Sequence, residues 1–192
     1  MLETIGHFID PLEPTDEYLT LGFSPSPRAR EERWRNYGLS ADFLGDYFAT
    51  FFPGTAKDGD RIAQNDTVRS SVSYVANELI ENAIKYSDRT MAIPVVISLY
   101  LYNSNIVLLA SNCAPKALAH HFQDYSKTLV TSDLDVLYTQ QLERVATNQE
   151  GPSCLGLITM AVDYQAKLGW QFTSHATHEN IVIVRVMAQI DL

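Results

Sequence analysis

Two pairs of apolar, β-branched runs constrain the fold of this chain more than any other feature. The first pair is "PVVISLYLY" and "IVLLAS", separated by the polar turn "NSN", and the second is "GWQFTSHAT" and "ENIVIVRVMAQI". Apolar runs joined by a few turn residues are typical of β-hairpins. The "NSN" turn also leaves neither run of the first pair long enough to span a bilayer. The sequence therefore predicts two hairpins in one sheet.

Helical patterns precede the first hairpin. "EYLTLGFSP" alternates and predicts a further strand, and "PRAREERWRNY" predicts a short helix that we expect Gly38 to end. "SADFLGDYFATFF" predicts a second helix, with Ser40 as its N-cap. A third, long helix is expected over residues 67–87, with Asp66 or Thr67 as its cap.

The segment between the two hairpins is less regular. "DVLYTQQLERVA" is compatible with a helix, and a further helix is expected over residues 155–168, with Gly169 as its stop. The resulting order is β–α–α–α–β–β–insert–α–β–β. This order predicts an α+β protein with helices on one face of a mostly antiparallel, mixed sheet.

Length and charge limit the classes of protein to consider. The 192 residues predict one domain over residues 17–192, preceded by a Pro-punctuated acidic arm over residues 1–16. The net charge of −9 argues against binding to nucleic acid or to an anionic membrane surface, because both require a basic face. The chain does not open with a signal-peptide pattern, and two cysteines form no disulfide framework. We expect a soluble cytoplasmic protein.

The stretch "ELIENAIKYS", which starts at Glu78, carries the polar groups with the clearest chemistry. Glu78 and Asn82 lie one turn apart on one helix face, and Lys85 and Tyr86 follow. A solvated polar face is the simplest explanation of such a pattern. Asn is, however, disfavoured inside helices, because its amide competes with the backbone. Its oxygen is a suitable ligand for Mg²⁺, while a Lys can meet a phosphate and a Glu can accept a proton.

The same stretch resembles a known motif. "NELIENAIKYS" is similar to the N-box of the GHKL ATP-binding superfamily, whose members include histidine-kinase ATPase domains and anti-sigma-factor serine kinases. The E-x-x-x-N spacing is closest to the anti-sigma kinases, and this resemblance implies that Glu78 is a general base and that Asn82 holds Mg²⁺. Lys85 and Tyr86 match the continuation common in histidine kinases. The resemblance implies a Bergerat fold, a two-layer sandwich that binds ATP with Mg²⁺.

The family's second motif, D-x-G-x-G, is altered here. Its best match follows the strand "IVLLAS", with Asn112 in place of the Asp and with Ala114 and Lys116 in place of glycines. The resemblance implies that Asn112 accepts from the adenine amino group, without the charge assistance that an Asp would give. Loss of a glycine that the backbone needs costs about 1–2 kcal/mol.

The third motif, G-x-G-L-G-L, appears as "GPSCLGL". Gly151, Leu155, Gly156 and Leu157 match it or nearly so, whereas Ser153 or Cys154 replaces a glycine that would cradle phosphate. Two or three such defects, at about 1.4 kcal/mol each, would weaken a micromolar site to roughly submillimolar or millimolar affinity. Cellular ATP would still fill such a site in part.

These motifs imply a function and an alternative to it. The resemblance implies a bacterial signalling regulator of the anti-sigma-factor type, which binds a small regulatory protein and can phosphorylate it, and it is compatible with a homodimer. The alternative is a non-catalytic module with a decayed nucleotide pocket that sequesters its partner. Whether the chain is an enzyme, a serine/threonine kinase of the GHKL type, stays open from the sequence alone.

Three further features have less specific interpretations. Residues 116–150 fall where the family has its ATP lid, and their polarity predicts more mobility than the helix at 67–87. Cys113 and Cys154 lie in the two altered motifs, where a redox pair is conceivable but unreactive cysteines are more common. His120 and His121 are adjacent and point to different sides of a helix, which argues against a metal pair.

Overall fold

The computed structural model describes residues 2–24, 27–52, 59–88, 90–146 and 155–192. The strands in this part of the chain are β1 (Leu2–Gly6), β2 (Tyr18–Phe23), β3 (Val95–Leu101), β4 (Asn105–Pro115), β5 (Lys167–Ser174) and β6 (Ile181–Asp191). The helices are α1 (Pro27–Ala49), α2 (Gly59–Lys85), α3 (Lys116–Thr131), α4 (Leu134–Ala146) and α5 (Leu155–Val162). None of the described helices is long and apolar enough to cross a membrane.

All of the described strands belong to one sheet, in the order β1-β5-β6-β4-β3-β2. Both predicted hairpins are confirmed: β3 pairs with β4, β5 pairs with β6, and β4 and β6 join the two hairpins at the centre. Every neighbouring pair is antiparallel, so this part of the chain lacks the parallel pair that a mixed sheet would contain. The predicted α+β two-layer architecture is confirmed.

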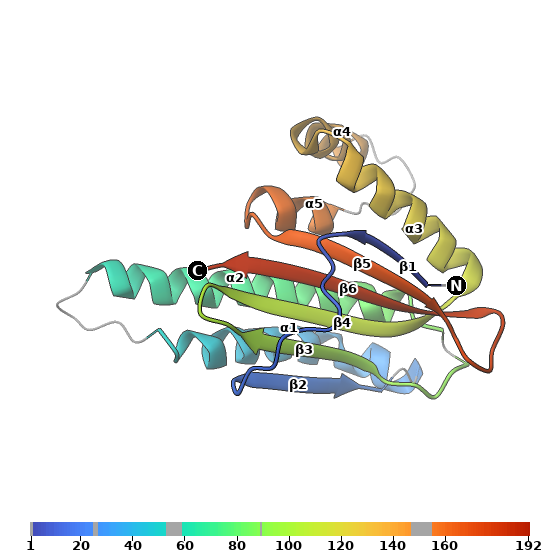
Figure 1. Cartoon of the computed structure of the whole chain (residues 1–192), viewed down its shortest axis with the longest axis horizontal. Coiled ribbons are helices and arrows are strands. Elements are labelled where there is room, and N and C mark those ends of the chain that lie inside the picture. The colour runs from blue at the N-terminus through green and yellow to red at the C-terminus, as the bar shows by residue number, and fades with distance from the viewer. Residues whose placement is uncertain (1, 25–26, 53–58, 89, 147–154) are drawn as a thin grey trace.

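The helices cover one face of this sheet (Figure 1). α2 packs across β3, β4 and β6, and α1 packs on α2. The core between the layers consists of alternate residues of the strands, such as Ile106, Leu108 and Ala110 of β4, against Leu79 and Ile80 of α2. Because strand side chains alternate between faces, the remaining residues of β4 point to the opposite face of the sheet.

The N-terminal segment covers that opposite face. Residues 7–17, which we call the strap, run from β1 at one edge of the sheet to β2 at the other (Figure 1). The Gln189 side chain donates to the His7 carbonyl at 2.6 Å, and Tyr102 donates to the Glu13 carbonyl at 2.8 Å. The predicted arm over residues 1–16 therefore supplies an edge strand and most of the strap.

Two helix boundaries differ from the prediction. α1 is continuous through Gly38, which does not end it, and α2 begins at Gly59 rather than near residue 67. A helical Gly costs only about 1 kcal/mol relative to Ala. Burial of Leu44 and Phe48 in the core shared with α2 offsets a cost of this size. Asn65 then fastens the early part of α2 by donating to the carbonyl of Ala49 at 2.6 Å.

The end of the predicted helix at 155–168 also differs. α5 stops at Val162, and β5 already begins at Lys167. Gln165 adopts a positive φ of 52° in the connection, and the Ala166 amide donates to the Met160 carbonyl at 2.9 Å. Gly169 is therefore a residue inside a strand and not a helix stop. The predicted helix stop is wrong, because Gly169 lies in β5 against the backbone of His7 and Phe8.

The segment 116–150 contains two helices. α4 contains the stretch "DVLYTQQLERVA", whose sequence is compatible with a helix, whereas α3 was not predicted. α3 packs on β1 and on the sheet through the buried residues Ala119, Ser126 and Leu129, and Lys127 pairs with Glu3 of β1 at 2.7 Å. The first half of the expected lid is thus packed against the body of the domain. The mobility expected of residues 116–150 remains a prediction.

Candidate functional site

The face of α2 that carries Glu78 lies at the centre of the candidate site. Glu78 and Asn82 are partly buried, as expected for side chains at the border of the helix layer, and Glu81 is exposed. Burial raises the pKa of the Glu78 carboxyl above its usual value, and the nearby Glu81 raises it further. Glu81 itself accepts a hydrogen bond from Asn77 at 3.2 Å. A carboxylate with a raised pKa is a stronger base than an ordinary glutamate.

Gly156 in α5 lies directly against this carboxylate. A Cβ placed on Gly156 would come within 1.8 Å of Glu78 Oε2 and 2.5 Å of Glu78 Cδ. The carboxylate therefore occupies the space that a side chain at position 156 would need. The stretch that resembles the N-box and the stretch that resembles the third motif, which the sequence separates by more than seventy residues, meet at this point.

An aromatic stack joins α2 to the turn after α5 beside this contact. The rings of Tyr74 and Tyr164 stack at 4.6 Å between centroids, with 15° between their planes. Burial, together with Glu78, Tyr164 and Asp163, raises the pKa of Tyr74, and the nearby Thr159 side chain opposes that rise. Sequence analysis missed these residues. Tyr74 lies one helical turn before Glu78, and this i−4 spacing is the signal that marks it.

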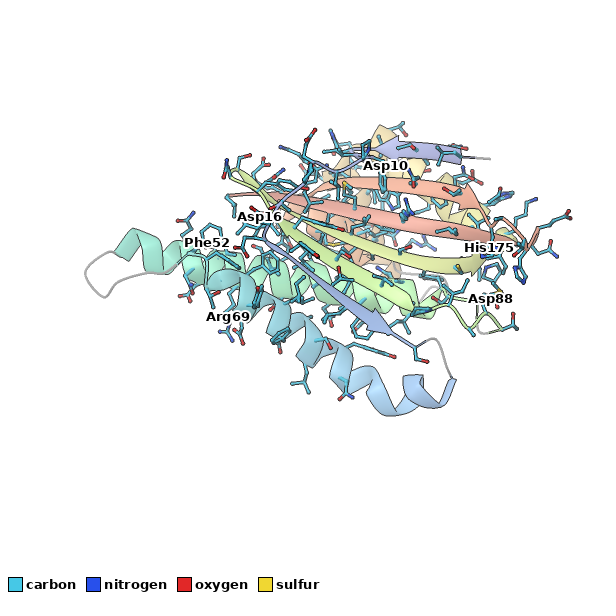
Figure 2. The ribbon with its side chains drawn as sticks, turned by 60° about the horizontal axis from the view of Figure 1, so that its bottom comes forward. Asp10, Asp16, Phe52, Arg69, Asp88 and His175 are labelled. Carbon is cyan, nitrogen blue, oxygen red and sulfur yellow. The ribbon has the colours of Figure 1, made fainter. Side chains whose placement is uncertain are left out.

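The end of α2 meets the end of β4. The Asp88 amide donates to the Cys113 carbonyl at 2.7 Å, which brings Lys85 and Tyr86 to the end of the strand that carries the second motif. Figure 2 shows Asp88 near that end of the sheet. Lys85 is exposed, and its Nζ lies 5.1 Å from the centroid of the Tyr86 ring. An exposed ammonium on a partly buried aromatic ring is suited to meet an anion from solvent.

Asn112 is a buried polar residue of β4. It points to the helix layer, because it alternates in β4 with the core residues Ala110 and Ala114, and only 6% of it is exposed. Among the described residues, the side-chain atom that is buried without a hydrogen-bond partner is Trp170 Nε1, and the amide of Asn112 is not in that state. The adenine-binding role of Asn112 remains a prediction.

Other predicted residues contribute to the core or fall outside the described part. Ala114 and Leu157 are buried in the hydrophobic core. Leu155 is partly exposed at the start of α5. Gly151, Ser153 and Cys154 lie outside the described residues. Cys113 is buried, and burial raises the pKa of its thiol. Within the described residues, no three His, Cys, Asp or Glu side chains are placed to hold a metal, so a Mg²⁺ ion at Asn82 would depend on nucleotide and water oxygens.

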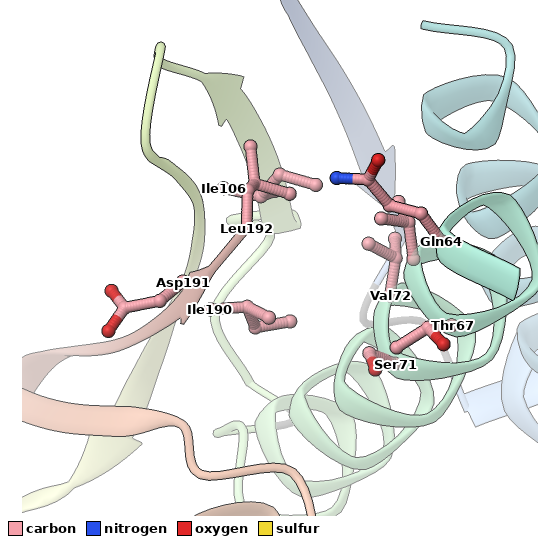
Figure 3. A pocket seen from close by; sticks show the side chains of 9 residues that line it. Gln64, Thr67, Ser71, Val72, Ile106, Ile190, Asp191 and Leu192 are labelled. Atoms are coloured by element: carbon pink, nitrogen blue, oxygen red, sulfur yellow. The ribbon is translucent and has the colours of Figure 1, made fainter. Parts of the chain in front are cut away.

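Two pockets formed by described residues lie away from this site. One pocket, of about 140 Å³, lies between the first half of α2 and the last residues of the sequence (Figure 3). Gln64 and Ser71 line it on the helix side, and Ile190 and Leu192 line it on the other side. The other, of about 430 Å³, lies between the strap and the sheet and includes Arg185 in its wall. Neither pocket is lined by Glu78 or Asn82.

The contact between Glu78 and Gly156 predicts a coupling between two mutations. Gly156→Ala alone should change stability little, because the gain in helix propensity is offset by displacement of the carboxylate. In the Glu78→Ala background the same change should stabilise the protein by up to about 1 kcal/mol. Urea unfolding of the four variants measures the coupling, which we expect to be about 1 kcal/mol.

Gly38→Ala in α1 is the matched control for this cycle. Gly38 is also helical, but a Cβ placed there meets no atom within 4 Å. Its effect should be the same with or without Glu78. If Gly156→Ala likewise has the same effect in both backgrounds, the two residues are not in contact.

Comparisons with known proteins identify a fold and no family. No family model matches the chain, and no curated protein matches it in sequence. Among solved structures, the chain is similar to one in the crystal structure of the SiaB-SiaC complex from Pseudomonas aeruginosa, with a TM-score of 0.60. The two chains are 15% identical, and the match covers 90% of this chain and 89% of that chain. At this identity the similarity shows a common fold over nearly the whole chain.

Proposed function

We propose that this protein is a signalling regulator that binds ATP with Mg²⁺ and phosphorylates a serine or threonine of a small protein partner. The observation that carries the proposal is the contact between Glu78 and Gly156, which joins the two motifs that an ATP site of the Bergerat type requires. The structural similarity to a chain of the SiaB-SiaC complex, a complex of two proteins, supports a protein partner.

The residues would divide the reaction as follows. Glu78, with its raised pKa, would accept the proton of the partner's hydroxyl. Asn82, on the same face of α2, would hold Mg²⁺ through its side-chain oxygen, and Lys85 would meet the phosphates. Asn112 would accept from the adenine amino group. The bound nucleotide would supply the phosphoryl group, and the protein would contribute position and charge.

Nucleotide binding provides the first test. Calorimetry should detect ATP or ADP at submillimolar to millimolar concentration, with tighter binding when Mg²⁺ is present. Asn82→Ala should abolish the Mg²⁺ dependence, because it removes the only side-chain oxygen that we assign to the metal.

Asn77→Ala supplies the control for that measurement. Asn77 lies on the same helix and donates to Glu81, so its removal deletes an amide without touching the assigned metal ligand. It should leave the Mg²⁺ dependence intact. Absence of binding by the unmodified protein at millimolar nucleotide would refute the kinase proposal.

A partner-sequestering module without catalysis is the second candidate. It is favoured by Ala114, which is buried in the core at a position where the family has a glycine. The backbone there has lost the freedom that close approach to a nucleotide uses. A protein that binds its partner with the same affinity with and without nucleotide, and that transfers no phosphate, would have this function.

A further inference from the structure

The hairpin loop between β5 and β6 carries two histidines whose ring nitrogens converge. His175 Nδ1 and His178 Nδ1 lie 3.3 Å apart, and the two rings are nearly perpendicular, at 73°. The Thr177 hydroxyl lies 2.9 Å from His178 Nδ1 and 3.4 Å from His175 Nδ1. The two ring nitrogens and the hydroxyl oxygen therefore form a compact triangle on one side of the loop. Figure 2 shows His175 at the end of this hairpin.

The loop backbone holds this arrangement in place. The His175 amide donates to the Ile181 carbonyl, and the Ile181 amide donates to the His178 carbonyl, both at 3.0 Å. A third bond, from the Lys116 amide to the Asn180 carbonyl at 2.8 Å, fastens the loop to the start of α3. The two histidines are thus anchored at both ends of a short closed turn, which reduces the entropy cost of bringing them together on a ligand.

The chemical state of the rings is suited to a cation. The Thr177 backbone amide can only donate, so its 3.3 Å contact identifies His175 Nδ1 as an acceptor with a lone pair. The contact of His178 Nδ1 with the same atom is then a hydrogen bond that His178 donates, and a cation held between the two rings would take the place of that proton. Two nitrogens 3.3 Å apart, each about 2.05 Å from a common ion, subtend about 107° at that ion, close to the tetrahedral angle.

We propose that His175 and His178 form a chelating site for a late first-row divalent cation, such as Zn²⁺, Ni²⁺ or Cu²⁺. Imidazole nitrogens suit these ions, whereas Mg²⁺ prefers oxygen ligands. The Thr177 hydroxyl oxygen is a weak third ligand on the same side of the loop. No group of three or more His, Cys, Asp or Glu in the described residues completes a site, so water or a donor from outside the chain fills the other positions.

The test measures Zn²⁺ and Ni²⁺ binding to the untagged protein by calorimetry. We expect one site, and we expect His178→Ala or His175→Ala to weaken binding at least roughly tenfold, because each removes one of two nitrogen ligands. The double variant His120→Ala/His121→Ala is the matched control. It also removes two exposed imidazoles, but these are adjacent on α3, so it should leave the affinity unchanged.

Paramagnetic broadening of imidazole signals by substoichiometric Ni²⁺ gives an independent reading in the unmodified protein. The signals of His175 and His178 should broaden first, ahead of those of His7, His120 and His121, and Mg²⁺ should not displace the Ni²⁺. Equal broadening of all five histidines, or undiminished affinity in both single variants, would overturn the proposal. The outcome does not depend on nucleotide or on Glu78, so it is separate from the proposed function.

Discussion

Glu78→Gln is expected to lower phosphate transfer to the partner by about 10²–10⁴-fold while leaving nucleotide and partner binding intact. Glutamine keeps the size of the side chain and a hydrogen-bond acceptor, and it still occupies the space beside Gly156. What it removes is basicity. Transfer of radiolabelled phosphate from ATP into a partner captured with the unmodified protein measures the loss.

Glu81→Gln is the control for that result. Glu81 lies three residues further on α2, is exposed, and also raises the pKa of Glu78, so its neutralisation should change transfer only slightly. The raised pKa of Glu78 adds a pH signature. Because the base must be ionised to act, the acid side of the rate profile should fall at a higher pH than an ordinary glutamate would give. Normal transfer by Glu78→Gln would show that Glu78 is not the base.

The elements with strong periodicity were predictable from the sequence. The hairpins β3–β4 and β5–β6 follow from apolar runs with short polar breaks, and the helix with Glu78 and Asn82 follows from its apolar spacing. In these segments the local pattern and the final packing agree. The fold class could therefore be predicted from four strands and one helix.

Elements whose formation depends on distant partners could not be predicted. β1 has only five residues, and its pairing partner β5 lies at the other end of the chain. Gly38 predicted a helix end, but a cost of about 1 kcal/mol does not break α1, because this helix packs on α2 through the buried residues Leu44 and Phe48. Local propensity is a weak determinant wherever tertiary burial is large.

The candidate site shows the same division. Glu78, Asn82, Lys85 and Tyr86 could be identified because they lie in one short stretch, whose chemistry is visible without a fold. The stacking of Tyr74 on Tyr164 could not be identified, because it joins α2 to the turn after α5, and the sequence does not encode their approach locally.

Gly169 is a glycine whose structural role depends on a contact with a distant part of the chain, the strap. A Cβ at this position would lie 2.3 Å from the Phe8 nitrogen, 2.5 Å from the His7 carbonyl carbon and 2.7 Å from the Phe8 Cα. All three are backbone atoms, which cannot rotate away as a side chain can. The strap therefore crosses β5 at Gly169, the one residue of β5 without a side chain. The strap begins directly after Gly6, whose φ of 66° turns the chain out of β1.

Gly169→Ala should consequently destabilise the protein by about 2–3 kcal/mol, because the added methyl group forces the strap off the sheet. For a domain of this size, such a loss lowers the melting temperature by roughly 5–10 °C. Amide exchange should accelerate in β1 and at His7, whose amide donates to the Leu168 carbonyl at 2.8 Å, and should stay slow in β3 and β4.

Gly22→Ala in β2 distinguishes this contact from a general effect of glycine in strands. A Cβ at Gly22 meets no atom within 4 Å, so the substitution should change stability by less than about 0.5 kcal/mol. If Gly169→Ala were equally mild, the strap would yield without loss, and its bonds to Gln189 and Tyr102 would contribute little to the fold. A large difference between the two variants would show that the strap is an integral part of the sheet, held by a backbone contact that only glycine permits.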